Sequence, residues 1–379
     1  MIVYLDNAAT TKVSPAAVQA AVAAMTEHFG NPSARYPMGA QAAKSMKADR
    51  EVVAKALGCD AKELYFTSCG TESDNWAIQI ALHKNRRVGK HIITTAIEHS
   101  AILEPCRQLE LQGYEVTYLR PDETGCVKLS DLEQALRPDT ILVSMMLVNN
   151  ELGTIQPMKE AVRLTRKLSP KALFHTDAVQ GFLKVPFTPK ALGVDLLSIS
   201  GHKIHAPKGI GALYVRSGLQ IQPMILGGGQ ENGMRSGTEP TAQIAALAAA
   251  CKEGKASFRK DTAHMAELKA YTLEQLALHV PECRRIGAGE VPHVLALTLP
   301  GYKAEVLVRV LGDMGVCVSA GSACHRGKPS HVYAAMGLDK GAREGSFRVS
   351  FSGENTKEEI DVFVQCLEKA KEQLFTSMS

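Results

Sequence analysis

A lysine at the end of a buried strand is the residue whose surroundings most strongly suggest chemistry in this sequence. Lys203 follows the aliphatic run 195–200, which is typical of a short buried strand, and it lies between Gly201 and Gly209. Most lysines lie at the solvated surface. A partly desolvated lysine has a lowered pKa, and its neutral amine is a nucleophile that forms a Schiff base with a carbonyl. The sequence therefore suggests a pyridoxal phosphate site, although a structural lysine in a turn would give the same pattern.

Polar side chains also end two other strand-like runs. The run 172–177 ends in Asp177, which Gln180 follows three residues later, and the run 140–148 leads into an Asn-Asn-Glu motif at 149–151. In an open α/β sheet, ligands bind at the carboxyl ends of the strands. A carboxylate placed there can keep a pyridine nitrogen protonated, so that the ring accepts electrons. A single aspartate after a strand is more often a turn or capping residue. Asp177 is therefore a candidate site residue only in combination with Lys203.

The segment after the strand-like run 64–67 has the composition of an anion-binding turn. Gly70 and Thr71 lie in a stretch of small residues, 68–73, and helical periodicity follows over 74–84. Backbone N–H groups and the helix dipole at such a helix N-terminus favour a phosphate group. The same residues could simply cap the helix, and the segment lacks the Gly-Lys-Ser/Thr ending of a Walker loop.

Strand-like and helical stretches alternate between residues 63 and 216, which is the pattern of a mostly parallel sheet covered by helices. A long Ala-rich helical stretch, either one helix or two in series, covers about 241–280 and leads to a second, smaller domain. We therefore expect an α/β fold. The helices expected in the first part are 101–111, 129–136 and 159–168, and the second part is expected to hold strands at 294–299 and 347–351 and helices at 304–314 and 357–374.

The composition is that of an ordinary globular protein and argues against several classes. The chain has 379 residues, of which 45% are hydrophobic and 22% charged, and this length is enough for two domains. A formal net charge of +4 is too small to indicate a nucleic-acid partner, and no apolar stretch is long enough to span a membrane. The N-terminus lacks the features of a secretory signal. Nine cysteines without CxxC pairs fit a reducing cytoplasm rather than disulfides or a metal site.

One cysteine has the surroundings of a reactive thiol. Cys324 lies in a stretch rich in Gly, Ala and Ser that continues through His325, Arg326 and Lys328, and this composition is typical of a loop. Positive neighbours lower the pKa of a thiol and raise its thiolate fraction. A cysteine without such neighbours is usually a small buried hydrophobe, which is the role we expect of the other eight. Packing is also the role expected of Cys69, although it lies in the anion-binding segment.

Taken in order along the chain, these motifs resemble those of the pyridoxal-phosphate-dependent cysteine desulfurases that supply sulfur for iron–sulfur clusters. The resemblance covers essentially the whole chain. It implies a pyridoxal-phosphate transferase fold of type I, with a large cofactor-binding domain at 14–258 and a smaller α+β domain formed by 1–13 and 259–379. The smaller domain would carry the cysteine loop at about 319–330. The motifs are 4–11, 30–33, 70–75, 98–99, 149–151, 177 with 180, 200–203, 235–238 and 319–324.

The resemblance also implies a role for each motif. Lys203 would hold pyridoxal 5′-phosphate as a Schiff base and move the Cα proton of the substrate L-cysteine. The Cys324 thiolate would attack the substrate sulfur, so that alanine leaves and a persulfide remains. Arg348, with Asn31, would hold the substrate carboxylate. The implied cofactor contacts are Gly70, Thr71, Ser200 and His202 at the phosphate, Asp177 at the ring nitrogen, His99 stacked on the ring and relaying protons, Gln180 and Asn150 near the ring hydroxyl, and Thr238, which would reach the phosphate in the other subunit of a homodimer.

The sequence departs from the family pattern in three places. Tyr36 stands where a histidine is usual, and His325-Arg326 stand where a small polar residue is more typical. The chain also ends soon after its last helical stretch, whereas many members continue into a tail that docks a scaffold protein. The sulfur acceptor therefore stays open between a cluster scaffold, a tRNA-modifying enzyme and a nitrogenase-specific system.

Three other readings share the same residues. An aminotransferase would need Lys203 and Asp177 but has no use for Cys324. A selenocysteine lyase shares the fold and differs in how strictly it refuses sulfur. A catalytically silent assembly subunit would be expected to have lost the lysine or the cysteine first. The resemblance associates the chain with metal binding only through iron–sulfur cluster assembly, and it leaves open whether Cys324 ligates a cluster in a complex; no metal ligand set is expected within the chain.

Overall fold

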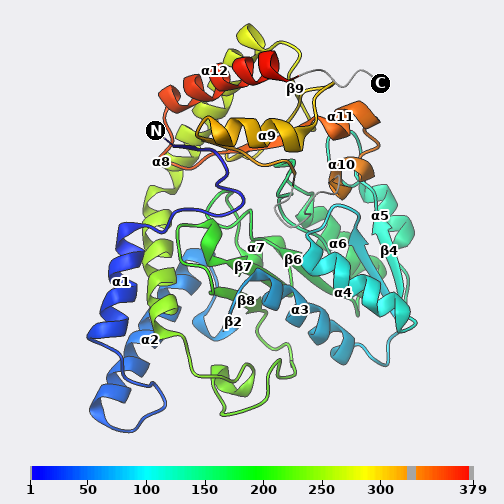
Figure 1. The fold of residues 1–379 in the computed structure, drawn as a ribbon. Coiled ribbons are helices and arrows are strands. Elements are labelled where there is room, and N and C mark those ends of the chain that lie inside the picture. Colours follow the sequence, from blue (N-terminus) through cyan, green and yellow to red (C-terminus); the bar gives the residue numbers. More distant parts are fainter. Residues whose placement is uncertain (1, 322–329, 375–379) are drawn as a thin grey trace.

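The computed structural model describes residues 2–321 and 330–374, and its centre is a seven-stranded sheet (Figure 1). The strand order is β2-β8-β7-β6-β5-β3-β4, and within this sheet only β8 runs antiparallel to its neighbours. The expectation of a mostly parallel sheet is thus confirmed. The strands are β2 (Leu64–Thr67), β3 (His91–Thr95), β4 (Glu115–Leu119), β5 (Thr140–Ser144), β6 (Leu173–Asp177), β7 (Leu196–Ser200) and β8 (Gly211–Val215).

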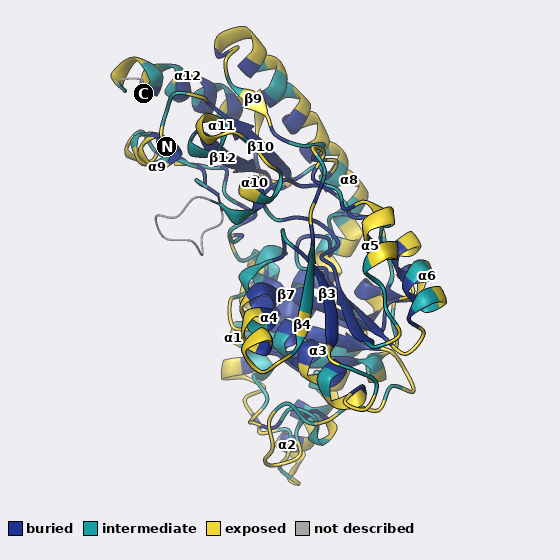
Figure 2. Cartoon of the chain, turned by 90° about the vertical axis from the view of Figure 1, so that its right-hand side faces the viewer, coloured by how far each residue is buried: buried dark blue, intermediate teal, exposed yellow. Residues whose placement is uncertain are grey.

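Helices cover both faces of this sheet, and Figure 2 shows most of its strands in dark blue, whereas the edge strand β4 is partly exposed. Side chains alternate across a strand, so Leu142 and Val143 of β5 enter hydrophobic clusters on opposite faces, as do Leu196 and Leu197 of β7. Burial on both faces explains why β5 and β7 are rich in aliphatic residues. The helical elements of this part are η1 (Ala61–Glu63), α3 (Gly70–Lys84), α4 (Ser100–Leu111), α5 (Leu129–Ala135), α6 (Met158–Leu168), α7 (Pro189–Leu192), η2 (Gly201–Lys203) and η3 (Glu231–Gly233).

A single helix, α8 (Thr241–His279), links the two parts of the molecule (Figure 1). Its first half packs against α1 (Pro15–Thr26) and α2 (Pro37–Leu57) and contributes Leu247 to the core around the large sheet. Its second half contributes Leu268 to a separate C-terminal core. The Ala-rich stretch is therefore one helix, where the sequence had left one or two open.

The C-terminal core is built on a three-stranded sheet of order β12-β10-β9, and the start of the chain joins it. Strand β1 pairs in parallel with β11, and Val3 and Leu5 belong to this core. The exact domain limits stay a prediction. The elements are β1 (Val3–Tyr4), β9 (Arg284–Arg285), β10 (Val294–Thr298), β11 (Val316–Cys317), β12 (Ser346–Ser350), α9 (Ala304–Asp313), α10 (His331–Ala335), α11 (Lys340–Glu344) and α12 (Lys357–Gln373).

Two expected elements differ from the structure by more than one residue at one end. Helix α3 begins at Gly70 rather than at Asp74, because the Glu72 carboxylate accepts hydrogen bonds from the N–H and the hydroxyl of Ser68 and closes an extra first turn. The strand expected over 140–148 ends at Ser144, since the N–H of Met146 turns to the Glu98 carboxylate.

The helices of the described chain give no sign of a membrane span: none of them is both long enough and apolar enough to cross a bilayer.

Candidate active site

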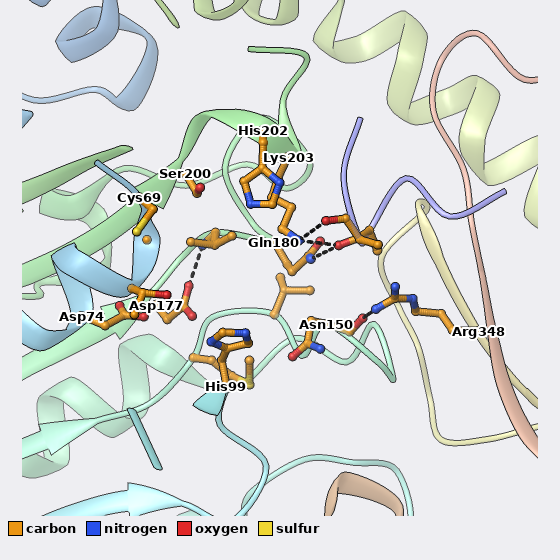
Figure 3. A pocket seen from close by; sticks show the side chains of 17 residues that line it. Cys69, Asp74, His99, Asn150, Asp177, Gln180, Ser200, His202, Lys203 and Arg348 are labelled. Carbon is orange, nitrogen blue, oxygen red and sulfur yellow. Dashed lines mark hydrogen bonds between the residues drawn. The ribbon is translucent and has the colours of Figure 1, made fainter. Parts of the chain in front are cut away.

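The polar strand ends meet in one cavity of about 240 Å³ at the carboxyl ends of β5, β6 and β7 (Figure 3). Because neighbouring parallel strands end at the same edge of a sheet, three separate sequence motifs converge here. The start of α3, the N-terminal segment and β12 complete the walls. The lining residues are Ala8, Ala9, Cys69, Gly70, Thr71, Asp74, His99, Met146, Val148, Asn150, Asp177, Val179, Gln180, Ser200, His202, Lys203 and Arg348.

Lys203 ends η2, directly after β7, and its amine lies in the cavity. Its Nζ donates hydrogen bonds to the backbone carbonyls of Ala8 and Ala9, both at 2.7 Å. A Cβ at Gly201 would lie 2.9 Å from the Ile210 side chain, so the tight turn that directs the lysine requires glycine. The amine is thus held in the site by the N-terminal segment of the same chain.

Asp177, at the end of β6, faces the cavity as a buried carboxylate. Burial raises the pKa of Asp177 to about 6, while the hydrogen bond from the Val179 N–H and the positive charge of Lys203 oppose this rise. Asp177 is therefore mainly ionised at neutral pH. A carboxylate in this position suits a protonated ring nitrogen.

A second acid, Asp74, lies beside Asp177 and was missed by the sequence reasoning (Figure 3). Burial and, next, the charge of Asp177 raise the pKa of Asp74 well above its usual range. Its Oδ1 lies 3.5 Å from Nε2 of His175, whose pKa burial lowers to about 3, so the pair is a neutral contact and not an ion pair. Asp74 lies one helical turn after Gly70. If the sequence analysis had begun the helix at Gly70, it would have placed both residues on the face of the helix towards the cavity.

The first turn of α3 and two residues after β7 form a cradle for an anion. N–H groups in the first turn of a helix have no partner within the helix. A Cβ at Gly70 would lie 2.9 Å from Val179 Cγ2, so glycine keeps the turn close to the cavity. The Ser200 hydroxyl is buried and has no hydrogen-bond partner among the described residues. Burial, followed by the charge of Lys203, lowers the pKa of His202 to about 4, which leaves a neutral ring.

His99 lies across the cavity from Ser200 and His202, at the start of α4 (Figure 3). Its Nδ1 accepts a hydrogen bond from the Ala101 N–H at 3.1 Å, which fixes the ring by capping the helix. Between these walls there is room for a planar ring with a phosphate group at one end. The arrangement of cradle, lysine and carboxylate fits pyridoxal phosphate.

Arg348, on β12, forms the end of the cavity away from Asp177. It is 2% exposed, and its Nη1 donates to the Asn150 carbonyl at 2.7 Å. Its Nη2 donates to the Asp6 carboxylate at 2.8 Å, while Nε has no partner among the described residues. A buried guanidinium with a spare donor suits an incoming carboxylate.

Some predicted site residues do not line this cavity within one chain. Asn31 and Thr238 are exposed, and the Asn31 side chain accepts a hydrogen bond from the Ser33 N–H. Tyr36 is 57% exposed. Cys324 and the basic residues after it fall outside the described residues, although Ser319 before them pairs with Arg348 through two backbone hydrogen bonds. Among the described residues, no group of three or more His, Cys, Asp or Glu side chains could hold a metal ion.

Known proteins resemble this chain over nearly its whole length. The aminotransferase class-V family matches residues 3–363. A cysteine desulfurase of Nostoc sp. is 41% identical over 381 residues, which cover 98% of this chain and 94% of that protein. A solved NifS-like protein has a TM-score of 0.92 at 37% identity and covers 99% of this chain and 100% of its own. SspA, solved in complex with cysteine, has a TM-score of 0.81 at 33% identity, with 93% and 99% coverage. The chain therefore belongs to the class-V aminotransferase family and, within it, to the cysteine desulfurases.

Proposed function

We propose that this enzyme converts L-cysteine to L-alanine with pyridoxal 5′-phosphate in the cavity and with Cys324 as the first acceptor of the sulfur. The observation that supports it most is that the side chains of Lys203, Asp177 and Arg348 line one cavity. An aminotransferase would explain the same three residues, but relatives that match 98% of this chain are named cysteine desulfurases.

The cofactor would be held by residues of α3, β6, β7 and η2. The first turn of α3, with Gly70 and Thr71, and the unpartnered hydroxyl of Ser200 suit its phosphate. Asp177 would contact the ring nitrogen of the cofactor, and Lys203 would bind its aldehyde group. When bound, the cofactor supplies an electron sink for the carbanion that forms when a substrate loses its Cα proton.

The two buried acids at the ring end would have different protonation states. Asp177 carries the negative charge at neutral pH, because its pKa of about 6 is the less raised of the two. Asp74 keeps its proton, because burial and the neighbouring charge both disfavour a second carboxylate. Asp177 can thus stabilise a positive charge on a ring nitrogen, and Asp74 can donate a hydrogen bond.

Arg348 would bind the substrate carboxylate and set the amino acid in the cavity with its Cα towards Lys203. A guanidinium holds a carboxylate through two parallel N–H groups and so fixes its orientation. Lys203 Nζ would then accept the Cα proton, and His99, fixed by its helix cap, would help to move protons above the ring.

Cys324 would remove the sulfur in a step that conserves electrons. Its thiolate attacks the substrate sulfur, an S–S bond forms, and the C–S bond breaks with its electron pair remaining on Cβ. A proton delivered to that carbon gives alanine, and Cys324 holds the sulfur as a persulfide. The persulfide would pass to an acceptor protein such as a cluster scaffold or a tRNA-thiolation enzyme. We propose a cytoplasmic location, which the eight free cysteines of the described chain support.

We propose that the enzyme works as a homodimer. Four apolar side chains on or just after α1, at spacings of one helical face, are between 46% and 62% exposed: Val18, Val22, Met25 and Phe29. Large exposed apolar side chains that are grouped in this way are typical of an interaction surface. Asn31 lies just beyond it on the exposed surface. A second copy of the chain on this face would explain why Asn31 and Thr238 do not line the cavity of their own subunit.

The proposal is tested by supplying L-cysteine to the purified protein loaded with pyridoxal phosphate and measuring alanine and released sulfide. Equal amounts of alanine and of sulfide plus protein-bound sulfur are expected. Pyruvate in place of alanine, or transfer of the amino group to a keto acid as the main reaction, would show that the protein is not a desulfurase.

A further inference from the structure

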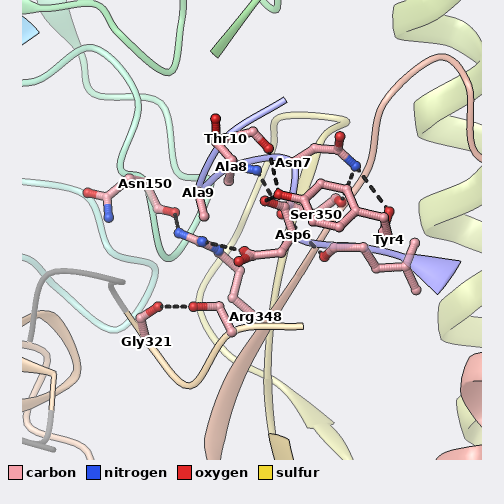
Figure 4. A network of polar contacts seen from close by, with 12 residues as sticks. Tyr4, Asp6, Asn7, Ala8, Ala9, Thr10, Asn150, Gly321, Arg348 and Ser350 are labelled. Carbon is pink, nitrogen blue, oxygen red and sulfur yellow. Dashed lines mark hydrogen bonds and ion pairs between the residues drawn. The ribbon is translucent and has the colours of Figure 1, made fainter. Parts of the chain in front are cut away.

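The N-terminal segment lines part of the cavity with Ala8 and Ala9, and it contacts Arg348, the group proposed to bind the substrate carboxylate (Figure 4). The Asp6 carboxylate accepts a hydrogen bond from Arg348 Nη2 at 2.8 Å, and the two side chains form an ion pair. Arg348 is 2% exposed, whereas the Asp6 side chain is 19% exposed. The positive charge in the cavity wall therefore already has an anionic partner in the same chain.

The position of this contact matters because of how a guanidinium binds carboxylates. A bidentate carboxylate uses one of two edges, either Nε with Nη2 or Nη1 with Nη2. Both edges include Nη2, the nitrogen that donates to Asp6. Nη1 donates a hydrogen bond to the Asn150 carbonyl. On the edge with Nε only Nη2 already has a partner, because Nε is buried without a hydrogen-bond partner among the described residues. An amino acid arriving there must displace Asp6 or bring a second carboxylate close to it.

The backbone around Asp6 is held in place, so the carboxylate cannot simply drift away. Asp6 bridges to Ser350 of β12, and the Asn7 side chain donates to the Ser350 carbonyl and to Asn355. The hydroxyl of Tyr4 donates to the Asp6 carbonyl. Only rotation of the Asp6 side chain towards solvent would free Nη2. The backbone contacts thus keep the Asp6 carboxylate within reach of Arg348.

We propose that Asp6 limits the affinity of this enzyme for amino acids: its carboxylate pairs with Arg348 in the free site and competes with the carboxylate of the amino acid. The proposal rests on the proposed role of Arg348. A buried cation without a counter-ion is costly, so Asp6 stabilises the free enzyme. The same contact weakens the binding of every ligand that must use Nη2, substrate L-cysteine and product L-alanine alike, and so favours release of the product.

The test compares binding of L-alanine to the wild-type holoenzyme and to Asp6→Asn, measured by titration calorimetry. Asparagine has the same shape but no charge, so L-alanine should bind about ten-fold more tightly to the variant, which corresponds to a modest Coulomb term at a partly exposed position. L-Alaninamide, which lacks the carboxylate, should bind equally to both proteins. Unchanged or weaker binding of L-alanine to Asp6→Asn would overturn the proposal.

A second pair of variants separates this inference from the role of Arg348 itself. Arg348→Lys should weaken the binding of L-alanine, and Asp6→Asn should have a smaller effect in the Arg348→Lys background, because the two residues act on one carboxylate. If Arg348→Lys binds L-alanine like the wild type, the proposed role of Arg348 fails. If only Arg348→Lys has an effect, that role stands and the competition by Asp6 is refuted. Thermal unfolding of each variant shows whether it is folded.

Discussion

The chemistry of this site depends on a few buried residues whose charge the protein sets by burial. Asp177 and Asp74 are close together, and burial raises the pKa of both. Two neighbouring carboxyl groups cannot both ionise at low cost, so one keeps its proton. Similar pairs assign acid and base roles in many enzymes.

Lys203 is predicted to be the residue that holds the cofactor. Borohydride reduction of the holoenzyme should fix the cofactor covalently, and peptide mapping should place the adduct on the peptide with Lys203. Lys208 is the natural control, because it lies five residues later and does not line the cavity. An adduct found mainly on Lys208 would contradict the assignment. Lys203→Ala should lose turnover by several orders of magnitude and release the cofactor on dialysis.

Asp177→Asn tests whether the carboxylate tunes the ring. An amide cannot stabilise a protonated ring nitrogen by charge, and each pKa unit of coupling is worth about 1.4 kcal/mol. We expect the variant to retain some cofactor, seen in its absorption spectrum, and to lose most of its turnover, by about 100-fold or more. Asp74→Asn is the matched control and should lose much less, because Asp74 is neutral in the wild type. A near-normal rate in Asp177→Asn would show that another group does this work.

Glu98, next to His99, should make stability depend on pH. Burial raises the pKa of Glu98 to about 8, from an ordinary value of 4.5. Between these values the folded chain keeps a proton that the unfolded chain loses, so this group lowers stability as the pH rises through the window. Glu98→Gln should flatten the fall in the free energy of urea unfolding between pH 5 and 8 by about 1–3 kcal/mol. An identical pH profile for the variant and the wild type would rule this out.

At the scale of elements, the start of α3 carries the phosphate cradle and depends on glycine. Gly70→Val would bring a side chain within 3 Å of Val179 and push the first turn away from Ser200. We expect cofactor affinity to fall about ten-fold or more, measured by equilibrium dialysis, with a smaller change in melting temperature. Gly312→Ala in α9 is the control, since a Cβ there meets nothing within 4 Å. Normal cofactor affinity in Gly70→Val would exclude this turn from the phosphate site.

The sequence predicted the elements well where patterning is simple. Runs rich in aliphatic residues indicated β5 and β7, because parallel strands that are buried on both faces are usually apolar. It failed at the start of α3, where a side-chain contact between Glu72 and Ser68 extends the helix. That contact is local, but small residues over 68–73 also suit a turn, and the error hid Asp74.

The long-range contacts of the site residues were harder to predict than the site residues themselves. The strand-end residues converge because the sheet is parallel, a rule that sequence reasoning can use. The contact of Asp6 with Arg348, and of Ala8 and Ala9 with Lys203, joins positions almost 200 residues or more apart. No local pattern in the sequence encodes such contacts.

At the scale of the whole molecule, the apolar face of α1 should hold two subunits together. Val22→Glu places a charge on that face and is expected to weaken the dimer at least ten-fold, seen as a monomer by light scattering at micromolar concentration. Activity should fall when the dimer dissociates, since Thr238 is proposed to contact the cofactor phosphate in the other subunit. Val306→Glu, at a similarly exposed position on α9, should leave both unchanged. A fully dimeric Val22→Glu protein would show that the interface lies elsewhere.

The central claim, that Cys324 receives the sulfur, is tested most directly by mass spectrometry of the holoenzyme after brief exposure to L-cysteine. One added sulfur should appear on the peptide that contains Cys324. Cys324→Ser should still bind the cofactor and respond spectrally to L-cysteine, yet release no alanine. Added sulfur on Cys69 or Cys317 instead, or alanine released by Cys324→Ser at the wild-type rate, would contradict the mechanism.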